Sequence, residues 1–152
     1  MALGTFRVAD IVRQLIIATS YGNYAVKKAS IVIPATAAQN NTVDFMELPV
    51  GVRIVDCILR TTAAAAGVVT FQVGIAQKPG KSATLVDDDA LIIAATITTA
   101  ATIRRRNNIA VGFAGLTLND TYLIQGLIGA AALGATPVTA ELDVMYEYLG
   151  TL

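Results

Sequence analysis

Hydrophobic and polar residues alternate in short runs along most of the chain. The clearest run covers residues 68–77, where Val69, Phe71, Val73 and Ile75 are separated by small or polar residues. This alternation is typical of a β-strand with one buried face. The second face of the run consists of Thr, Gln, Gly and Ala and carries no charge, which raises the question of what covers it.

Further runs of this kind predict about eight strands, separated by Gly, Pro, Asn and Asp. The predicted strands cover residues 27–35, 41–48, 51–62, 68–77, 90–96, 99–105, 121–131 and 136–149. No helical pattern separates them, which argues against parallel β–α–β units. We therefore predict an all-β fold, an antiparallel sandwich of two sheets with jelly-roll topology. An immunoglobulin-like sandwich is the alternative, although the chain has no Trp and a single Cys.

The beginning of the chain follows a helical pattern instead. Between residues 7 and 17 apolar residues recur at the spacing of one helical face, and Thr5 is a candidate N-cap. The apolar face comprises five candidate interface residues, Val8, Ile11, Val12, Leu15 and Ile16. We divide the chain into an N-terminal arm with a short amphipathic helix, residues 1–25, and a β-sandwich domain, residues 26–152.

Two predicted strands are apolar on both faces. In residues 51–62 the two faces are formed by Val52, Ile54 and Ile58, and by Val55, Cys57 and Leu59. In residues 121–131 they are formed by Leu123 and Leu127, and by Tyr122, Ile124 and Ile128. A strand that is apolar on both sides needs a cover for its outer face. We expect this cover to be another subunit, with Tyr122, Ile124 and Ile128 as candidate interface residues; the alternative is the arm folded back on its own domain.

The composition supports extensive subunit contacts. Hydrophobic residues make up 55% of the chain and charged residues only 14%, against about 25% in typical soluble domains. Mean hydropathy is +0.62. A membrane span needs about 20 consecutive apolar residues, and no segment meets that requirement. Arg7, Asp10 and Arg13 interrupt the first apolar block, which argues against a secretory signal. We therefore expect no membrane association, and a surface that is covered by other protein subunits.

Charges are balanced, with 11 basic and 11 acidic residues, which argues against nucleic acid as a partner. Arg104, Arg105 and Arg106 form a candidate interface cluster; a solvated turn is the alternative. All charged residues after Arg106 are acidic, and three of them alternate along the last predicted strand. This pattern predicts either pairing within one fold or an acidic strand that meets basic residues of a neighbouring subunit.

Candidate chemistry is sparse. The chain has no histidine, which removes Ser-His-Asp and Cys-His catalysis and the usual zinc sites. Cys57 lies in an apolar run and is expected to be a buried thiol. Asp87, Asp88 and Asp89 are expected to form a solvated acidic loop, with Ca²⁺ binding as the alternative. We predict that the protein is not an enzyme and that it has no catalytic residues, cofactor or metal.

Residues 43–76 resemble part of small structural proteins of tailed bacteriophages. The resemblance rests on a turn between two strands and on a later Val-Gly strand, and its residues are Leu48, Pro49, Gly51, Arg53, Ile54, Val73 and Gly74. The family it indicates is that of head decoration, or cement, proteins. The resemblance implies a jelly-roll domain, often trimeric, that clamps neighbouring major capsid subunits on the outside of the shell.

The resemblance also implies location and partners. It predicts a virion protein that is made in the host cytoplasm and bound at the capsid surface, with the major capsid protein and copies of itself as partners and a trimer as the favoured oligomer. Other virion components are alternatives, namely a head-fibre base, a tail component or a coat protein. A carbohydrate-binding module is a further alternative, although aromatic residues make up only 6% of the chain.

Overall fold

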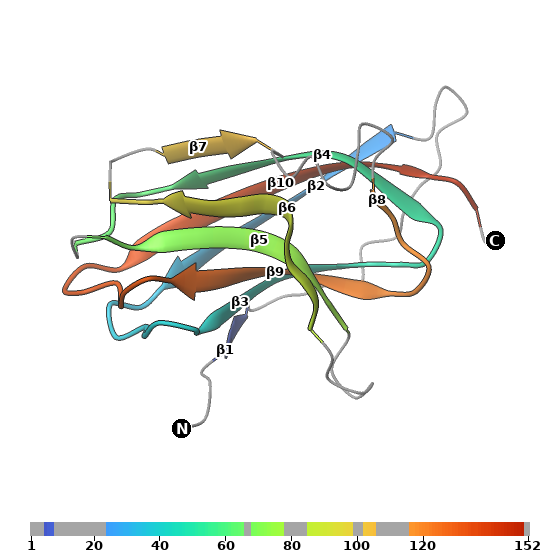
Figure 1. The fold of residues 1–152 in the computed structure, drawn as a ribbon. Helices are drawn as coiled ribbons and strands as arrows, with labels where there is room; N and C mark the ends of the chain where they lie inside the picture. Colours follow the sequence, from blue (N-terminus) through green and yellow to red (C-terminus); the bar gives the residue numbers. More distant parts are fainter. Residues whose placement is uncertain are drawn as a thin grey trace.

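The computed structural model describes residues 5–7, 24–65, 68–77, 85–98, 102–105 and 116–150. These residues form ten strands (Figure 1). The strands are β1 (Thr5–Arg7), β2 (Tyr24–Ile33), β3 (Thr42–Leu48), β4 (Val52–Thr61), β5 (Thr70–Gln77), β6 (Leu85–Thr96), β7 (Thr102–Arg105), β8 (Leu116–Thr117), β9 (Tyr122–Gly129) and β10 (Val138–Tyr148). Within the described ranges, no helix has the length and apolar character needed to cross a membrane.

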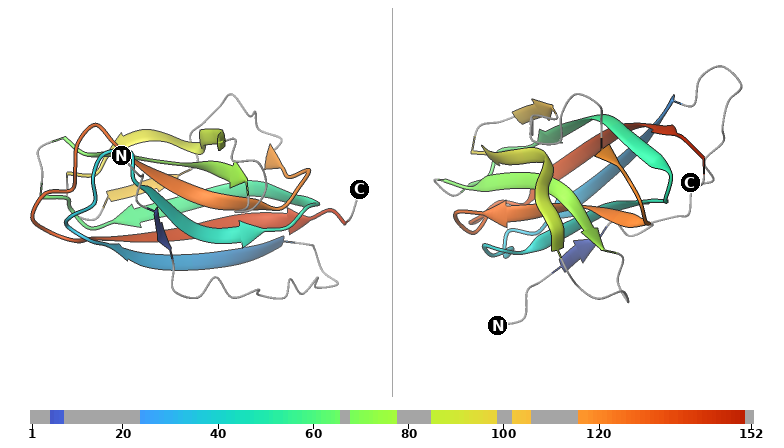
Figure 2. Two further views of the ribbon diagram at one scale, coloured as in Figure 1. Left: turned by 90° about the horizontal axis from the view of Figure 1, so that it is seen from below. Right: turned by 45° about the vertical axis from the view of Figure 1, so that its right-hand side comes forward.

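The strands form two sheets packed face to face, and Figure 2 shows the two layers from two further directions. One sheet has the order β1-β3-β9-β5-β6 and the other has the order β2-β10-β4-β7, with β8 pairing β4. Without β1 and β8, the antiparallel pairs are nested: β2 with β10, β3 with β9, β4 with β7 and β5 with β6. This nesting is the jelly-roll topology. The predicted sandwich and its topology are confirmed.

Several predicted boundaries change. Thr5 and Arg7 belong to β1, so Thr5 is a strand residue and not a helix N-cap. The helical face of Val8, Ile11, Val12, Leu15 and Ile16 lies outside the described residues. Strand β2 begins at Tyr24, inside the segment assigned to the arm. Strand β6 begins at Leu85, so Asp87–Asp89 lie in a strand and not in a loop.

The buried residues of β4 all lie on one side of the strand, although the sequence places apolar residues on both of its faces. The pairing of β4 with β10 shifts register between Met145 and Tyr146, so that the ladder passes over Val55. Such a β-bulge exchanges the two faces of a strand. Val52 and Ile54 before it, and Cys57 and Leu59 after it, are therefore all fully buried. The assignment of Cys57 and Leu59 to a second, outward face of β4 is wrong, whereas the expectation that a subunit covers β4 stays a prediction.

The core between the sheets is built from aliphatic side chains around one aromatic pair. The rings of Phe45 and Phe71 meet edge to face, with centroids 6.2 Å apart and an interplanar angle of 84°. Gly126 lies against them, and a Cβ atom at this position would stand 2.3 Å from Cζ of Phe71. A side chain at residue 126 would therefore displace the aromatic pair.

The uncharged outer face of β5 is covered in part by β6. Four residues of β6, 88–91, lie opposite the single residue Gly74 of β5. A Cβ atom on Gly74 would lie 2.1 Å from the carbonyl oxygen of Asp87 and 2.4 Å from the carbonyl carbon of Asp88. The backbone of β6 thus presses against Gly74, and glycine is required there because any side chain would meet backbone atoms. At this position the cover of β5 is its own hairpin partner.

Candidate interface on the outer face of the β2–β10–β4 sheet

Strand β10 has one buried and one solvent-facing side, as its alternation predicts. Ala140, Leu142 and Val144 are fully buried in the core, whereas Glu141 and Met145 are exposed. The neighbours β2 and β4 align with β10 in register, so that their outward residues form rows across the sheet. We call the outward residues of β2, β10 and β4 the outer face.

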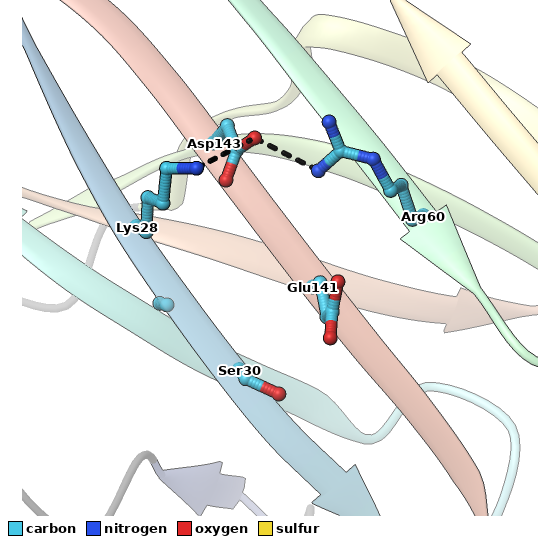
Figure 3. A pocket seen from close by; sticks show the side chains of 6 residues that line it. Lys28, Ser30, Arg60, Glu141 and Asp143 are labelled. Atoms are coloured by element: carbon cyan, nitrogen blue, oxygen red, sulfur yellow. Dashed lines mark hydrogen bonds and ion pairs between the residues drawn. The ribbon is translucent and has the colours of Figure 1, made fainter.

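An ion-pair cluster occupies the middle of the outer face (Figure 3). Arg60 donates a hydrogen bond from Nη1 to Oδ2 of Asp143 at 2.8 Å, and Nζ of Lys28 lies 3.8 Å from the same oxygen. Asp143 on β10 thereby joins β4 to β2. Pairs of this kind at a surface contribute about 0–1 kcal/mol each to stability. The cluster therefore fixes side-chain positions more than it stabilises the fold.

A shallow hollow of about 340 Å³ adjoins this cluster. Its lining consists of Lys28, Ala29, Ser30, Arg60, Glu141 and Asp143. Glu141 is exposed at its edge, with Ser30 and Arg60 as cross-strand neighbours (Figure 3). The two basic and two acidic groups balance in charge. The hollow therefore offers both donors and acceptors of hydrogen bonds to a polar partner without attracting one sign of charge.

A second ion pair lies at one end of the outer face. Nη2 of Arg53 is 2.7 Å from Oε1 of Glu147. The hydrogen bond from Arg53 lowers the pKa of the Glu147 carboxyl below its usual value, and the same contact raises the pKa of Arg53. Glu147 and Asp143 are thus paired within their own sheet. Of the two explanations offered for the acidic last strand, pairing within one fold is therefore the one that holds for Glu147 and Asp143.

Exposed apolar side chains surround the charged groups. Tyr24, Val26 and Val32 on β2 are 62%, 52% and 62% exposed, and Met145 on β10 is 38% exposed. Val26 and Met145 are register partners, so they lie side by side. Among the described residues, four of the seven exposed large hydrophobic side chains lie on these two strands. A group of exposed apolar side chains is a feature of protein-binding surfaces, although here the charged groups lie in the middle of the face and not at its rim.

The fold is similar to that of chains from bacteriophage capsids. A chain in the capsid of Ralstonia phage GP4 matches with a TM-score of 0.76 and 18% identity, over 98% of this chain and 100% of that chain. A chain of the cyanophage Pam1 capsid matches with a TM-score of 0.57 and 17% identity, over 91% of this chain and 94% of that one. A chain in the acidic stable capsid structure of Helicobacter pylori bacteriophage KHP30 matches with a TM-score of 0.56 and 13% identity, over 85% of this chain and 90% of that chain. No family model and no curated protein matches the sequence.

The three interface residues predicted on β9 differ in burial. Ile124 and Ile128 are fully buried in the core, so their side chains face the opposite sheet and are not available to a partner. Tyr122 is half-buried, and its hydroxyl donates a hydrogen bond to Oδ1 of Asn119 at 2.7 Å. The sequence had assigned these three to one face but could not tell that this face points inward. Leu123 and Leu127 are on the outward side.

The arginine cluster is described only in part. Arg104 and Arg105 lie on β7, at the edge of the β2-β10-β4-β7 sheet, where their backbones pair with Leu59 and Ile58. Arg106 lies outside the described residues. Their role as interface residues stays a prediction.

The three aspartates of β6 are packed closely. Carboxylate oxygens of Asp87, Asp88 and Asp89 all lie within 4.8 Å of one another, and the backbone N–H of Asp89 donates to Oδ1 of Asp87 at 3.3 Å. Burial, a hydrogen bond with Asp87 and the negative charge of both neighbours raise the pKa of Asp89. The three residues are half-buried, so they are not the solvated loop that the sequence predicts.

The exposed residues of β2 were not predicted. Residues 24–33 carry apolar side chains on both faces, and Tyr24, Val26 and Val32 lie on the face that is exposed to solvent. The signal that identifies the inner side is the pair of Ile residues at 31 and 33, which are both buried. Because both faces of β2 carry aliphatic residues, alternation alone could not assign them.

Proposed function

We propose that this chain is a structural component of a bacteriophage capsid, and that it acts as a head decoration protein on the outside of the shell. The observation that carries the proposal is the match to the Ralstonia phage GP4 capsid chain, which extends over nearly the whole of both chains. Matches of similar extent to two other phage capsids support it. A partial match would have indicated a common sheet motif alone.

The outer face of β2, β10 and β4 is the proposed attachment surface. Its exposed valines and Met145 offer apolar area to a partner, while Lys28, Arg60 and Glu141 offer hydrogen bonds that set orientation. Burial of apolar surface stabilises an interface by roughly 25 cal/mol per Å². Many copies held on one lattice gain avidity, so that each copy needs only modest affinity. Such a clamp requires no catalytic group.

A coat protein is the second candidate, because a chain that builds the shell would match capsid structures equally well. The two roles differ in what happens without the protein. A shell assembles without its decoration protein and then binds it, whereas no shell assembles without its coat protein.

The test is to assemble particles of the parent phage with this protein deleted and to add the purified chain back. We expect closed shells to form and to bind the chain saturably, as measured by sedimentation through sucrose. Substitution of Val26→Asp with Val32→Asp should weaken that binding at least tenfold, because both side chains are exposed on the attachment surface.

The matched control is Val68→Asp, a valine that is also 62% exposed but belongs to neither β2 nor β10. It should bind as the unaltered chain does. Failure of the deleted phage to form any shell would favour the coat protein. Shells that form but do not bind the chain would contradict both roles.

A further inference from the structure

Strand β1 stands outside the jelly roll. The eight nested strands are all antiparallel to their partners, whereas β1 pairs parallel with the beginning of β3. The contact comprises three register pairs, Thr5 with Thr42, Phe6 with Val43 and Arg7 with Asp44. Strand β1 lies on the side of β3 away from β9 and ends its sheet (Figure 1). Removing β1 would therefore leave the eight-stranded nest intact and the edge of β3 open.

The segment that joins β1 to β2 can be compared in length with the distance between the two strands. Residues 8–23 separate the two strands. Strand β1 lies beside the start of β3, and β3 follows directly after the end of β2. The segment that joins β1 to β2 must therefore run from the end of β2 back to its start. Ten strand residues span about 33 Å, and sixteen residues of chain reach at most about 55 Å. The maximum reach of sixteen residues therefore exceeds the length of β2.

A connection of sixteen residues does not by itself decide which copy of β3 the strand β1 pairs with. The same three pairs form whether β1 comes from the same chain or from a second copy, so the contact energy is equal in both cases. The choice then depends on the effective concentration of the tethered strand, which is in the millimolar range for flexible tethers. Neighbouring copies at comparable local concentration compete with it. Exchange of an identical element between copies is a low-energy route to association.

We propose that the edge of β3 at Thr42–Asp44 is an exchange site between copies of this chain. It is occupied by residues 5–7 of the same copy in dilute solution and by residues 5–7 of a neighbour when copies are crowded. The partner is a second copy of this chain, identified by the strand that already fits the site in parallel register. On a shell the exchange would link adjacent copies through their N-terminal strands. The inference does not depend on binding to a capsid.

The edge of β3 has a chemical feature that favours an occupied site. Asp44 is 1% exposed, although its register partner on β9 is the outward-facing Gln125, whose Nε2 donates to Oδ1 of Asp44 at 2.7 Å. Arg7 of β1 is the register partner of Asp44 on the other side of β3, so loss of β1 would leave the backbone edge of β3 unpaired beside this buried polar contact. An exchange keeps the edge of β3 paired in every copy, whereas simple release of β1 does not.

The experiment uses single cysteines as reporters of which chain supplies β1. The buried Cys57 is replaced by Ala in every variant, so that no other thiol is present. One full-length protein carries Thr5→Cys and a second carries Thr42→Cys. They are mixed at 1 mM and at 10 µM in a glutathione redox buffer. Facing residues of neighbouring strands are close enough for a disulfide.

Exchange predicts a disulfide-linked dimer of the two variants that reaches at least about a tenth of the chains at 1 mM and falls steeply at 10 µM. Mass spectrometry of the linked peptides identifies the junction between positions 5 and 42. The control mixes Thr5→Cys with Thr136→Cys, an exposed site in the loop before β10, and should give at least tenfold less dimer.

A double variant, Thr5→Cys with Thr42→Cys in one chain, calibrates the result. At 10 µM it should form a disulfide within the monomer, which shows that β1 occupies its site. Formation of that disulfide without any mixed dimer at 1 mM would overturn the exchange. Absence of both disulfides would overturn the β1 site itself.

Discussion

The two sheets differ in how far the side chains on their outward sides are exposed to solvent. On the β1-β3-β9-β5-β6 sheet the outward side chains of Asp44, Ala76 and Leu123 are only 1%, 6% and 3% exposed. On the β2-β10-β4-β7 sheet the outward Val26 and Val32 are 52% and 62% exposed. The first sheet is therefore closed at these three positions, although Ile93 on β6 is 44% exposed and Gln125 and Leu127 on β9 are half-buried, and the other sheet keeps an open apolar side. This difference is the basis for the proposal that copies or partners associate through the outer face of the second sheet.

Lys27 gives the open sheet a further property. It lies on β2 between inward-facing residues, and its ammonium donates a hydrogen bond to the carbonyl oxygen of Glu47 at 3.0 Å. Partial burial lowers the pKa of Lys27, with the charge of Glu47 opposing that effect. An inward-pointing charge on an outermost strand discourages further strands from pairing with it. Lys27 thus disfavours growth of the sheet at the edge of β2.

The largest expected effect concerns the covered side at Gly74. Gly74→Ala should lower the free energy of unfolding by about 3 kcal/mol, because the new Cβ would meet the backbone of Asp87 and Asp88. Urea denaturation measures the change. Gly129→Ala is the matched control, since the only close contact of its Cβ would be with the hydroxyl of Thr70, a side chain that can rotate. Equal losses in the two variants would contradict the close approach of β6.

A pair of truncations compares the two outward sides directly. Leu123→Ala should cost about 2–3 kcal/mol of stability, because the leucine is buried. Val26→Ala should change stability by less than about 0.5 kcal/mol, because this valine is exposed. Thermal and urea unfolding of the two variants provide the measurement. A costly Val26→Ala in the monomer would show that the open face is already covered.

The pair of Arg53 and Glu147 predicts a pH dependence. The pKa of Glu147 is lowered in the folded state, so the pair stabilises the protein above the carboxyl's unfolded value of about 4.5. This contribution should disappear as the pH falls through the folded pKa. Glu147→Gln should therefore lower Tm slightly at pH 7 and have no effect on Tm at pH 2. A Tm difference that persists at pH 2 would assign the effect to packing.

The smallest effect on stability is expected at Asp89. Here stability should change with pH in the direction opposite to that at Glu147. The raised pKa of Asp89 means that the charged form is disfavoured in the folded protein, so stability should increase as the pH falls through the folded pKa. Asp89→Asn should raise stability at pH 7 by less than about 1 kcal/mol, and this gain should shrink below pH 4. A loss of stability at pH 7 would show that the carboxylate's hydrogen bonds outweigh the repulsion.

The sequence was sufficient for the sandwich and insufficient for its faces. Alternation located most strands because buried strands impose a period of two, and the absence of helical runs excluded a parallel sheet. The bulge at Val55 is invisible to that period, so β4 was interpreted as apolar on both sides. Similarly, the cover of Gly74 depends on a bulge in β6, a strand whose first residues were assigned to a loop.

The candidate site was less predictable than the fold. The alternating acids of β10 located its outward side correctly, yet their partners Arg53 and Arg60 lie more than eighty residues earlier in the sequence. Ile124 and Ile128 were assigned to an interface because nothing in a strand that is apolar on both sides shows which face is inner. Only the register with β5, where Ile75 pairs with Ile124, places them in the core.

Cryo-electron microscopy of phage heads that carry this chain would show whether the open sheet faces its partner. We expect Tyr24, Val26, Val32 and Met145 to contact the capsid shell or an adjacent copy, and Gly74 and its covering strand to make no such contact. A map in which the β2–β10–β4 face points into solvent and the opposite sheet rests on the shell would refute this assignment of the two sheets.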